Sequence, residues 1–147
     1  MPRPGAGQRK TVGGHVRIRP FNTADSYPEQ QLSNDLCQAV VAGKTIYVRG
    51  QVAQDLDTGV NVAIGDPGGQ TEKVADNILQ LLAEAGAAPE HVVACTIYLT
   101  DIRYRQDVYR VLGERLRGVH YVSTGLVVTA LARPEWLVEV QVTAVLP

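Results

Sequence analysis

The scarcity of helices relative to strands is the feature that most constrains how this chain can fold. Apolar residues recur at helical spacing in two segments. The first begins at Thr71 and is closed by Gly86, and the second follows an N-cap at Asp101 and is closed by Gly118. Each segment therefore predicts one amphipathic helix.

The remaining apolar segments have the alternation or the β-branched composition of strands. They are residues 15–19, 36–41, 45–52, 91–100, 122–131 and 137–145. The second and third are separated by a short turn and predict a hairpin. Because helices interleave with strands, we expect an α+β or α/β fold with one mixed sheet.

The sheet of such a fold would have more apolar surface than two helices can bury. Residues 92–99 and 126–131 are apolar on both faces, whereas two helices cover one face. An apolar second face is not expected to stay in water. A loop lying over it would be the alternative, but the loops are short and polar. We therefore predict a symmetric oligomer whose sheets pack together.

Size and composition suit one domain with an ordinary core. The chain has 147 residues, of which 45% are hydrophobic and 20% charged. A net charge of −1 gives no support to a nucleic-acid partner. No apolar run is long enough to span a bilayer, which predicts no membrane association.

The N-terminal residues 1–14 are rich in Gly and Pro and lack the apolar stretch of a secretory signal. They predict a flexible arm in front of a single domain over residues 15–147. The two cysteines, Cys37 and Cys95, have no metal-type spacing and indicate a reduced thiol pair. Together these features predict a cytoplasmic protein.

The parity of the strands suggests a shared site on the second face of the sheet. In the last strand Glu139 opposes the apolar set, and in residues 45–52 the same holds for Arg49 and Gln51. Ser123 is assigned to the same cleft. Arg49 and Glu139 would then either form a structural ion pair or act on a ligand, with Arg49 clasping a carboxylate and Glu139 positioning water.

Three stretches carry a resemblance to a known family. "NDLCQAVVAGKTIYVRGQVAQDLDTG", "LLAEAGAAPEHVVACTIYLTD" and "LARPEWLVEVQVTAV" are similar to the RidA/YjgF family of reactive-intermediate deaminases. The resemblance implies a chorismate-mutase-like fold, with two helices on one face of a mixed sheet. It also implies a homotrimer with ligand clefts between subunits. The implied activity is hydrolysis of enamines and imines, such as 2-aminoacrylate, without a metal or organic cofactor.

The chain departs from the family pattern at residues that matter for chemistry. In deaminating members an arginine at the place of Ser123 binds the substrate carboxylate, and a small or thiol residue stands at the place of Gly125. A tyrosine falls on Leu36, and serines fall on Cys37 and Arg49. The family residues that remain are Gln38, Gly50, Gln51, Thr100, Asp101 and Glu139. Because a serine hydroxyl cannot replace a guanidinium, we do not expect ordinary 2-aminoacrylate hydrolysis.

These observations lead to one set of expected site residues and two open hypotheses. Glu139 and Arg49 are the predicted catalytic residues. Substrate binding is assigned to Arg49, Gln51, Cys37, Ser123 and Gly125. The first hypothesis is a trimeric imine or enamine hydrolase with a remodelled cleft for a small carboxylate metabolite. The second is a non-catalytic trimer that binds such a metabolite or regulates a partner.

Overall fold

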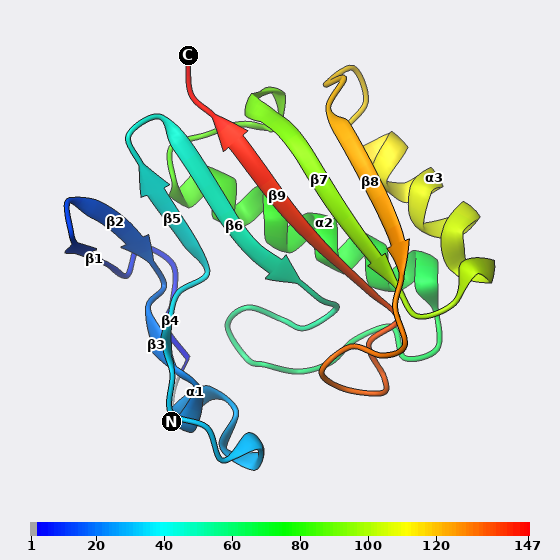
Figure 1. Ribbon diagram of the computed structural model, residues 1–147, viewed down its shortest axis with the longest axis horizontal. Coiled ribbons are helices and arrows are strands. Elements are labelled where there is room, and N and C mark those ends of the chain that lie inside the picture. Colours follow the sequence, from blue (N-terminus) through cyan, green and yellow to red (C-terminus); the bar gives the residue numbers. More distant parts are fainter. Residues whose placement is uncertain (1–2) are drawn as a thin grey trace.

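A seven-stranded mixed sheet is the main element of the computed structural model, which describes residues 3–147 (Figure 1). Across the sheet the strands run in the order β1-β2-β5-β6-β9-β7-β8. All neighbours are antiparallel except β7 and β8, which are parallel. The strands are β1 Arg9–Val12, β2 His15–Ile18, β5 Ala39–Ala42, β6 Thr45–Gln51, β7 Val92–Leu99, β8 Val122–Val127 and β9 Val138–Val145.

Two long helices, α2 (Pro67–Glu84) and α3 (Arg105–Arg115), pack on one face of this sheet (Figure 1). Helix α2 begins at Pro67 rather than at Thr71, because the Asp66 side chain accepts a hydrogen bond from the Gly69 amide and caps the first turn. Asp101 is confirmed as a cap, but of the short 3-10 helix Ile102–Tyr104 that precedes α3.

The core lies between the sheet and the two helices. Its strand side is formed by alternate residues of β9, and Val138, Val140, Val142 and Ala144 are all almost completely buried. Val74, Leu81 and Leu82 of α2 are equally buried on the other side. The parity of the last strand and the α+β class, with two long helices on one face of a mixed sheet, are therefore confirmed.

The N-terminal segment is folded rather than a flexible arm. Strand β1 pairs with β2, and the turn between them is Gly13-Gly14, both with positive φ. Positive φ angles suit a tight hairpin turn, and residues other than glycine rarely adopt them. The prediction for residues 1–14 is thus wrong for the hairpin, whereas Met1 and Pro2 lie outside the described residues.

A small lobe connects this hairpin to the rest of the sheet (Figure 1). It contains β3 (Phe21–Asn22), the single helical turn α1 (Thr23–Ser26), a 3-10 turn (Pro28–Gln30) and β4 (Asp35–Leu36). The strand predicted over residues 36–41 is split, because β4 pairs with β3 in a separate two-stranded sheet and β5 begins only at Ala39.

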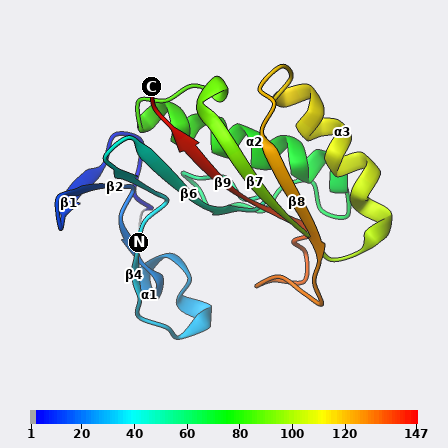
Figure 2. The ribbon, with the colours of Figure 1, turned by 45° about the horizontal axis from the view of Figure 1, so that its top comes forward.

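The face of the sheet opposite the helices, here called the open face, is uncovered in the single chain. Turning the molecule shows α2 behind the sheet and α3 along its β8 edge, and no helix of residues 3–147 lies over the opposite face (Figure 2). Large apolar side chains on this face are exposed: Tyr47, Val122, Leu126 and Val145. Within residues 3–147 no helix is both long and apolar enough to cross a membrane.

Candidate functional site

A β-bulge in β6 determines which of its side chains reach the open face. Val48 pairs with Val142 and Gln51 pairs with Val140, so the register shifts between them. Because Val140 faces the helices, Gln51 is buried there instead of sharing a face with Arg49. Its amide donates to the Gln38 side chain at 3.0 Å and to the Arg49 carbonyl at 2.9 Å. The expected projection of Gln51 is therefore wrong, and this residue holds the bulge in place.

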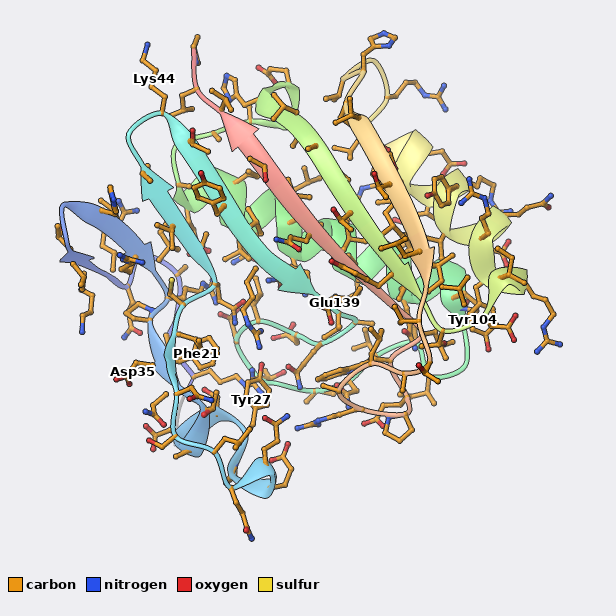
Figure 3. The ribbon with its side chains drawn as sticks, in the orientation of Figure 1. Phe21, Tyr27, Asp35, Lys44, Tyr104 and Glu139 are labelled. Atoms are coloured by element: carbon orange, nitrogen blue, oxygen red, sulfur yellow. The ribbon has the colours of Figure 1, made fainter. Side chains whose placement is uncertain are left out.

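Glu139 lies on the open face, where β9 passes β6 (Figure 3). A Cβ atom on Gly50 would stand 2.2 Å from the Glu139 Oε2 atom, so the carboxylate can lie over β6 only because residue 50 is glycine. Burial raises the pKa of Glu139, and the charge of Arg49 offsets part of this rise. The site thus holds a carboxyl group that takes up a proton more readily than an exposed one.

Arg49 is held by aromatic rings. Its guanidinium carbon lies 5.2 Å from the Phe21 ring centre and 5.9 Å from that of Tyr27. Within residues 3–147 no carboxylate forms an ion pair with Arg49. The structural ion pair with Glu139 is therefore absent in the single chain, and the two charges interact over a longer distance.

A cavity of about 850 Å³ opens beside Arg49, between the β1–β2 hairpin and the small lobe. We call it the Arg49 cavity. Its walls combine three basic residues with apolar ones, and they are formed by Lys10, Val12, Arg17, Pro20, Phe21, Asp35, Leu36, Cys37 and Arg49. A cavity with this lining suits a small anion with an apolar body.

Cys37 lines the Arg49 cavity, and its thiol is protonated. The thiol donates to the Ala39 carbonyl at 3.3 Å. Burial raises its pKa, and the positive charges of Arg17 and Arg49 offset only part of that effect. Cys95 in the core has a pKa raised to about 12 by burial. Neither thiol has the lowered pKa of a nucleophile.

Ser123 and Gly125 lie on the helix side of β8 and not on the open face. Ser123 pairs with Cys95 and Gly125 with Ile97, both of which face the core. At Gly125 a Cβ atom would stand 2.0 Å from the Tyr109 hydroxyl. The expected grouping of Ser123 with Arg49 and Glu139 is therefore wrong within this chain, because the parallel register with β7 places Ser123 on the opposite face.

Sequence reasoning missed the basic wall of the cavity, Lys10 and Arg17, and the aromatic support from Phe21. The signal for the first two was present. Arg17 alternates with Val16 and Ile18, and Gly13-Gly14 has the composition of a hairpin turn that would bring Lys10 opposite Arg17. The assignment of residues 1–14 to a flexible arm hid this pairing.

Comparisons with known proteins agree with this architecture. A family model described as endoribonuclease L-PSP matches residues 29–146. The chain is 36% identical to protein DfrA of Myxococcus xanthus over 94 residues, which is 64% of this chain and 71% of DfrA.

Solved structures with the same fold are similar over most of their length. A Mycobacterium tuberculosis member of the YjgF/YER057c/UK114 family has a TM-score of 0.71 and 26% identity, covering 90% of this chain and 99% of that one. RidA from the Antarctic bacterium Psychrobacter has a TM-score of 0.69 and 26% identity, covering 75% and 87%. From the extent of the matched model and the shared fold, the chain belongs to the RidA/YjgF family.

Proposed function

We propose that this protein hydrolyses a small imine or enamine that carries a carboxylate. The observation that carries the proposal is the presence of two separate groups on the open face. Arg49 has no carboxylate partner within residues 3–147, and the pKa of Glu139 is raised by burial. A free guanidinium beside a cavity suits anion binding. A carboxyl group whose pKa is raised by burial holds a proton more readily than an exposed one, which suits acid–base chemistry.

Binding would use the fork of Arg49 for the substrate carboxylate. The rings of Phe21 and Tyr27 hold the guanidinium, which reduces the side-chain entropy lost on binding. The apolar lining, including Leu36, would contact the body of the substrate.

The hydrolysis itself needs one water and one proton carrier. Glu139 as carboxylate takes a proton from water while the water oxygen bonds to the imine carbon. The C=N electron pair moves to nitrogen, which then takes that proton from Glu139. The resulting carbinolamine loses ammonia as its C–N bond breaks and its hydroxyl becomes a carbonyl, with the proton passing again through Glu139. An enamine first takes a proton on carbon and gives up a proton from nitrogen, which converts it into the imine. The products are a 2-oxo acid and ammonia.

The proposal includes a homotrimer. Exposed Val122, Leu126 and Tyr47 on the open face support an assembly that covers it. Every residue of the edge strand β8 is exposed. Ser123 and Gly125 lie on the face opposite Arg49 in their own subunit. In the proposed trimer they could therefore contribute only to the cleft of a neighbouring subunit. The free thiols of Cys37 and Cys95 support a cytoplasmic location.

The test is imine turnover. Imino acids are generated by an amino-acid oxidase in the presence of semicarbazide, and the protein is expected to lower the rate of semicarbazone formation. Glu139→Gln should lose turnover by about 10²-fold or more, and Arg49→Ala should raise KM. Lys44→Ala, on the exposed β5–β6 turn, is the matched control and should match the wild type.

Two results would decide against catalysis. If no imine of the panel is consumed faster than in buffer, the hydrolase proposal is wrong. If in addition 2-oxo acids bind the wild type and Glu139→Gln equally well, the protein is a metabolite-binding member of the family. The absence of an arginine at Ser123 and of a tyrosine at Leu36 is the observation that favours this second candidate.

A further inference from the structure

The far wall of the Arg49 cavity carries positive charge that a single carboxylate on Arg49 would not use. Lys10 of β1 pairs with Arg17 of β2, Arg17 pairs with Val40, and Val40 pairs with Tyr47. Cross-strand partners share a face, so Lys10 and Arg17 stand on the same open face as Tyr47. Both line the cavity together with Arg49.

Arg17 has an unsatisfied donor at this wall. Its Nη2 donates to the Val12 carbonyl at 3.3 Å, but its Nε is buried and has no hydrogen-bond partner within residues 3–147. A buried donor without a partner is unfavourable, so the described residues leave part of the hydrogen-bonding capacity of Arg17 unused. Within the same residues neither Lys10 nor Arg17 forms an ion pair with a carboxylate.

The charges of the cavity do not balance. Three basic residues, Lys10, Arg17 and Arg49, line it, against one carboxylate, Asp35. Asp35 already accepts a hydrogen bond from the Asn22 side chain at 2.9 Å. Arg17 and Arg49 line this cavity together with Cys37. One bound carboxylate would leave an excess of positive charge.

We propose that the ligand of the Arg49 cavity is a small dicarboxylate: one carboxylate binds Arg49 and the second binds Arg17 and Lys10, with an apolar chain between them against Phe21 and Leu36. This inference rests on the proposed function, because it takes Arg49 as the anchor of the first carboxylate. It narrows the substrate class to imines or enamines of acidic 2-oxo acids.

The second anchor comes from a part of the chain that the family model does not match. The match begins at residue 29, whereas Lys10 and Arg17 belong to the β1–β2 hairpin. The preference of the Arg49 cavity for a ligand with a second carboxylate would therefore depend on this hairpin and not on the part of the chain that the family model matches.

The experiment compares 2-oxo acids, the product class, by isothermal titration calorimetry. Oxaloacetate, 2-oxoglutarate and 2-oxoadipate are measured beside monocarboxylates of equal chain length. For the best chain length we expect the dicarboxylate to bind at least about tenfold tighter, as a charge-assisted contact provides. Arg17→Gln and Lys10→Gln should each weaken dicarboxylate binding by a larger factor than monocarboxylate binding and so reduce this preference, whereas the control Lys44→Gln should change neither affinity.

The outcomes separate this inference from the function on which it rests. The dicarboxylate proposal is wrong if both classes bind with equal affinity. It is also wrong if the preference survives in the double variant Arg17→Gln, Lys10→Gln. In either case the proposed function still stands provided that Arg49→Ala abolishes monocarboxylate binding. If no 2-oxo acid binds the wild type, both proposals fail. Lys10 is exposed in an edge strand, so Lys10→Gln gives a folded variant even if Arg17→Gln loses stability, as thermal melts would show.

Discussion

At the scale of single residues, the surroundings of Arg49 and Gly50 explain why a charged residue and a glycine stand side by side in a strand. The aromatic rings of Phe21 and Tyr27 support its guanidinium, and Gly50 leaves room for the Glu139 carboxylate. The sequence indicated the shared face of Arg49 and Glu139 through parity. It gave no sign of the rings, because Phe21 and Tyr27 are brought to β6 only by the fold of the small lobe.

The raised pKa of Glu139 makes a prediction about stability and pH. The folded state binds this proton more tightly than the unfolded state, so the stabilisation is fully present below the ordinary pKa of 4.5 and is lost as pH rises through the higher folded value. Gln cannot ionise. Glu139→Gln should therefore be more stable than the wild type at pH 7, and the difference should shrink toward pH 4.

Urea denaturation of both proteins at several pH values measures this difference. If Glu139→Gln is instead less stable at pH 7, the carboxylate is stabilised by an opposite charge, and the long-range account of Arg49 and Glu139 is wrong.

At the scale of elements, periodicity predicted the helices and the β9 alternation but not the register between strands. Gln51 was misplaced because a bulge reverses parity within β6, and a bulge has no signal in the apolar pattern. Ser123 was misplaced because β8 is exposed on both sides, so burial does not mark its core-facing residues. In β9, by contrast, alternate residues are fully buried, and composition follows parity.

A substitution at Gly50, within the bulge, tests whether the position of the Glu139 carboxylate matters for function. In Gly50→Ala the new Cβ would meet the far end of a flexible side chain, which can move aside. We expect turnover or ligand affinity to fall while the free energy of unfolding changes by less than about 1 kcal/mol.

Gly113→Ala in α3 is the matched control for the glycine change, because a Cβ there meets nothing within 4 Å. It should leave the site unaffected and raise stability by about 1 kcal/mol, as Ala has the higher helix propensity. Unchanged turnover in Gly50→Ala would show that the position of the Glu139 carboxylate does not matter for function.

Arg19 connects the end of β2 to the last turn of α2. Its side chain is 1% exposed and donates to both Glu84 carboxylate oxygens, at 2.9 and 2.8 Å, and to Asp57 at 2.8 Å. Arg19→Met would leave Glu84, itself only 11% exposed, without its partner. We expect a loss of about 3–5 kcal/mol in the free energy of unfolding.

Arg103→Met is the comparison for Arg19, because Arg103 also pairs with a carboxylate but is 82% exposed. Its denaturation midpoint should stay close to that of the wild type. Similar midpoints for Arg19→Met and Arg103→Met would mean that the buried pair does not stabilise the junction of hairpin and helix.

At the scale of the whole molecule, the uncovered face of the sheet is the feature that the sequence indicated most directly. Residues apolar on both faces and a count of two helices predicted it, and the structure has exposed Val122 and Leu126 on that face. The identity of the covering partner does not follow from one chain, because apolar surface specifies no particular occupant.

We expect a trimer in dilute solution. Leu126→Glu places a charge on the face that would be buried and should lower the mass measured by light scattering. Val60→Glu changes a valine that is also exposed but lies in a loop outside the sheet, and it should leave the mass unchanged. A wild type that scatters as a monomer at all concentrations would refute the assembly.

The central claim is that Arg49 anchors a carboxylate, and titration of a simple 2-oxo acid into the wild type and into Arg49→Ala tests it most directly. We expect measurable binding that weakens by at least about tenfold in Arg49→Ala, since a charge-assisted pair is lost. Arg49→Lys should lie in between, because it keeps the charge and loses the planar fork. Equal Kd values for the wild type and Arg49→Ala would show that Arg49 does not anchor the carboxylate.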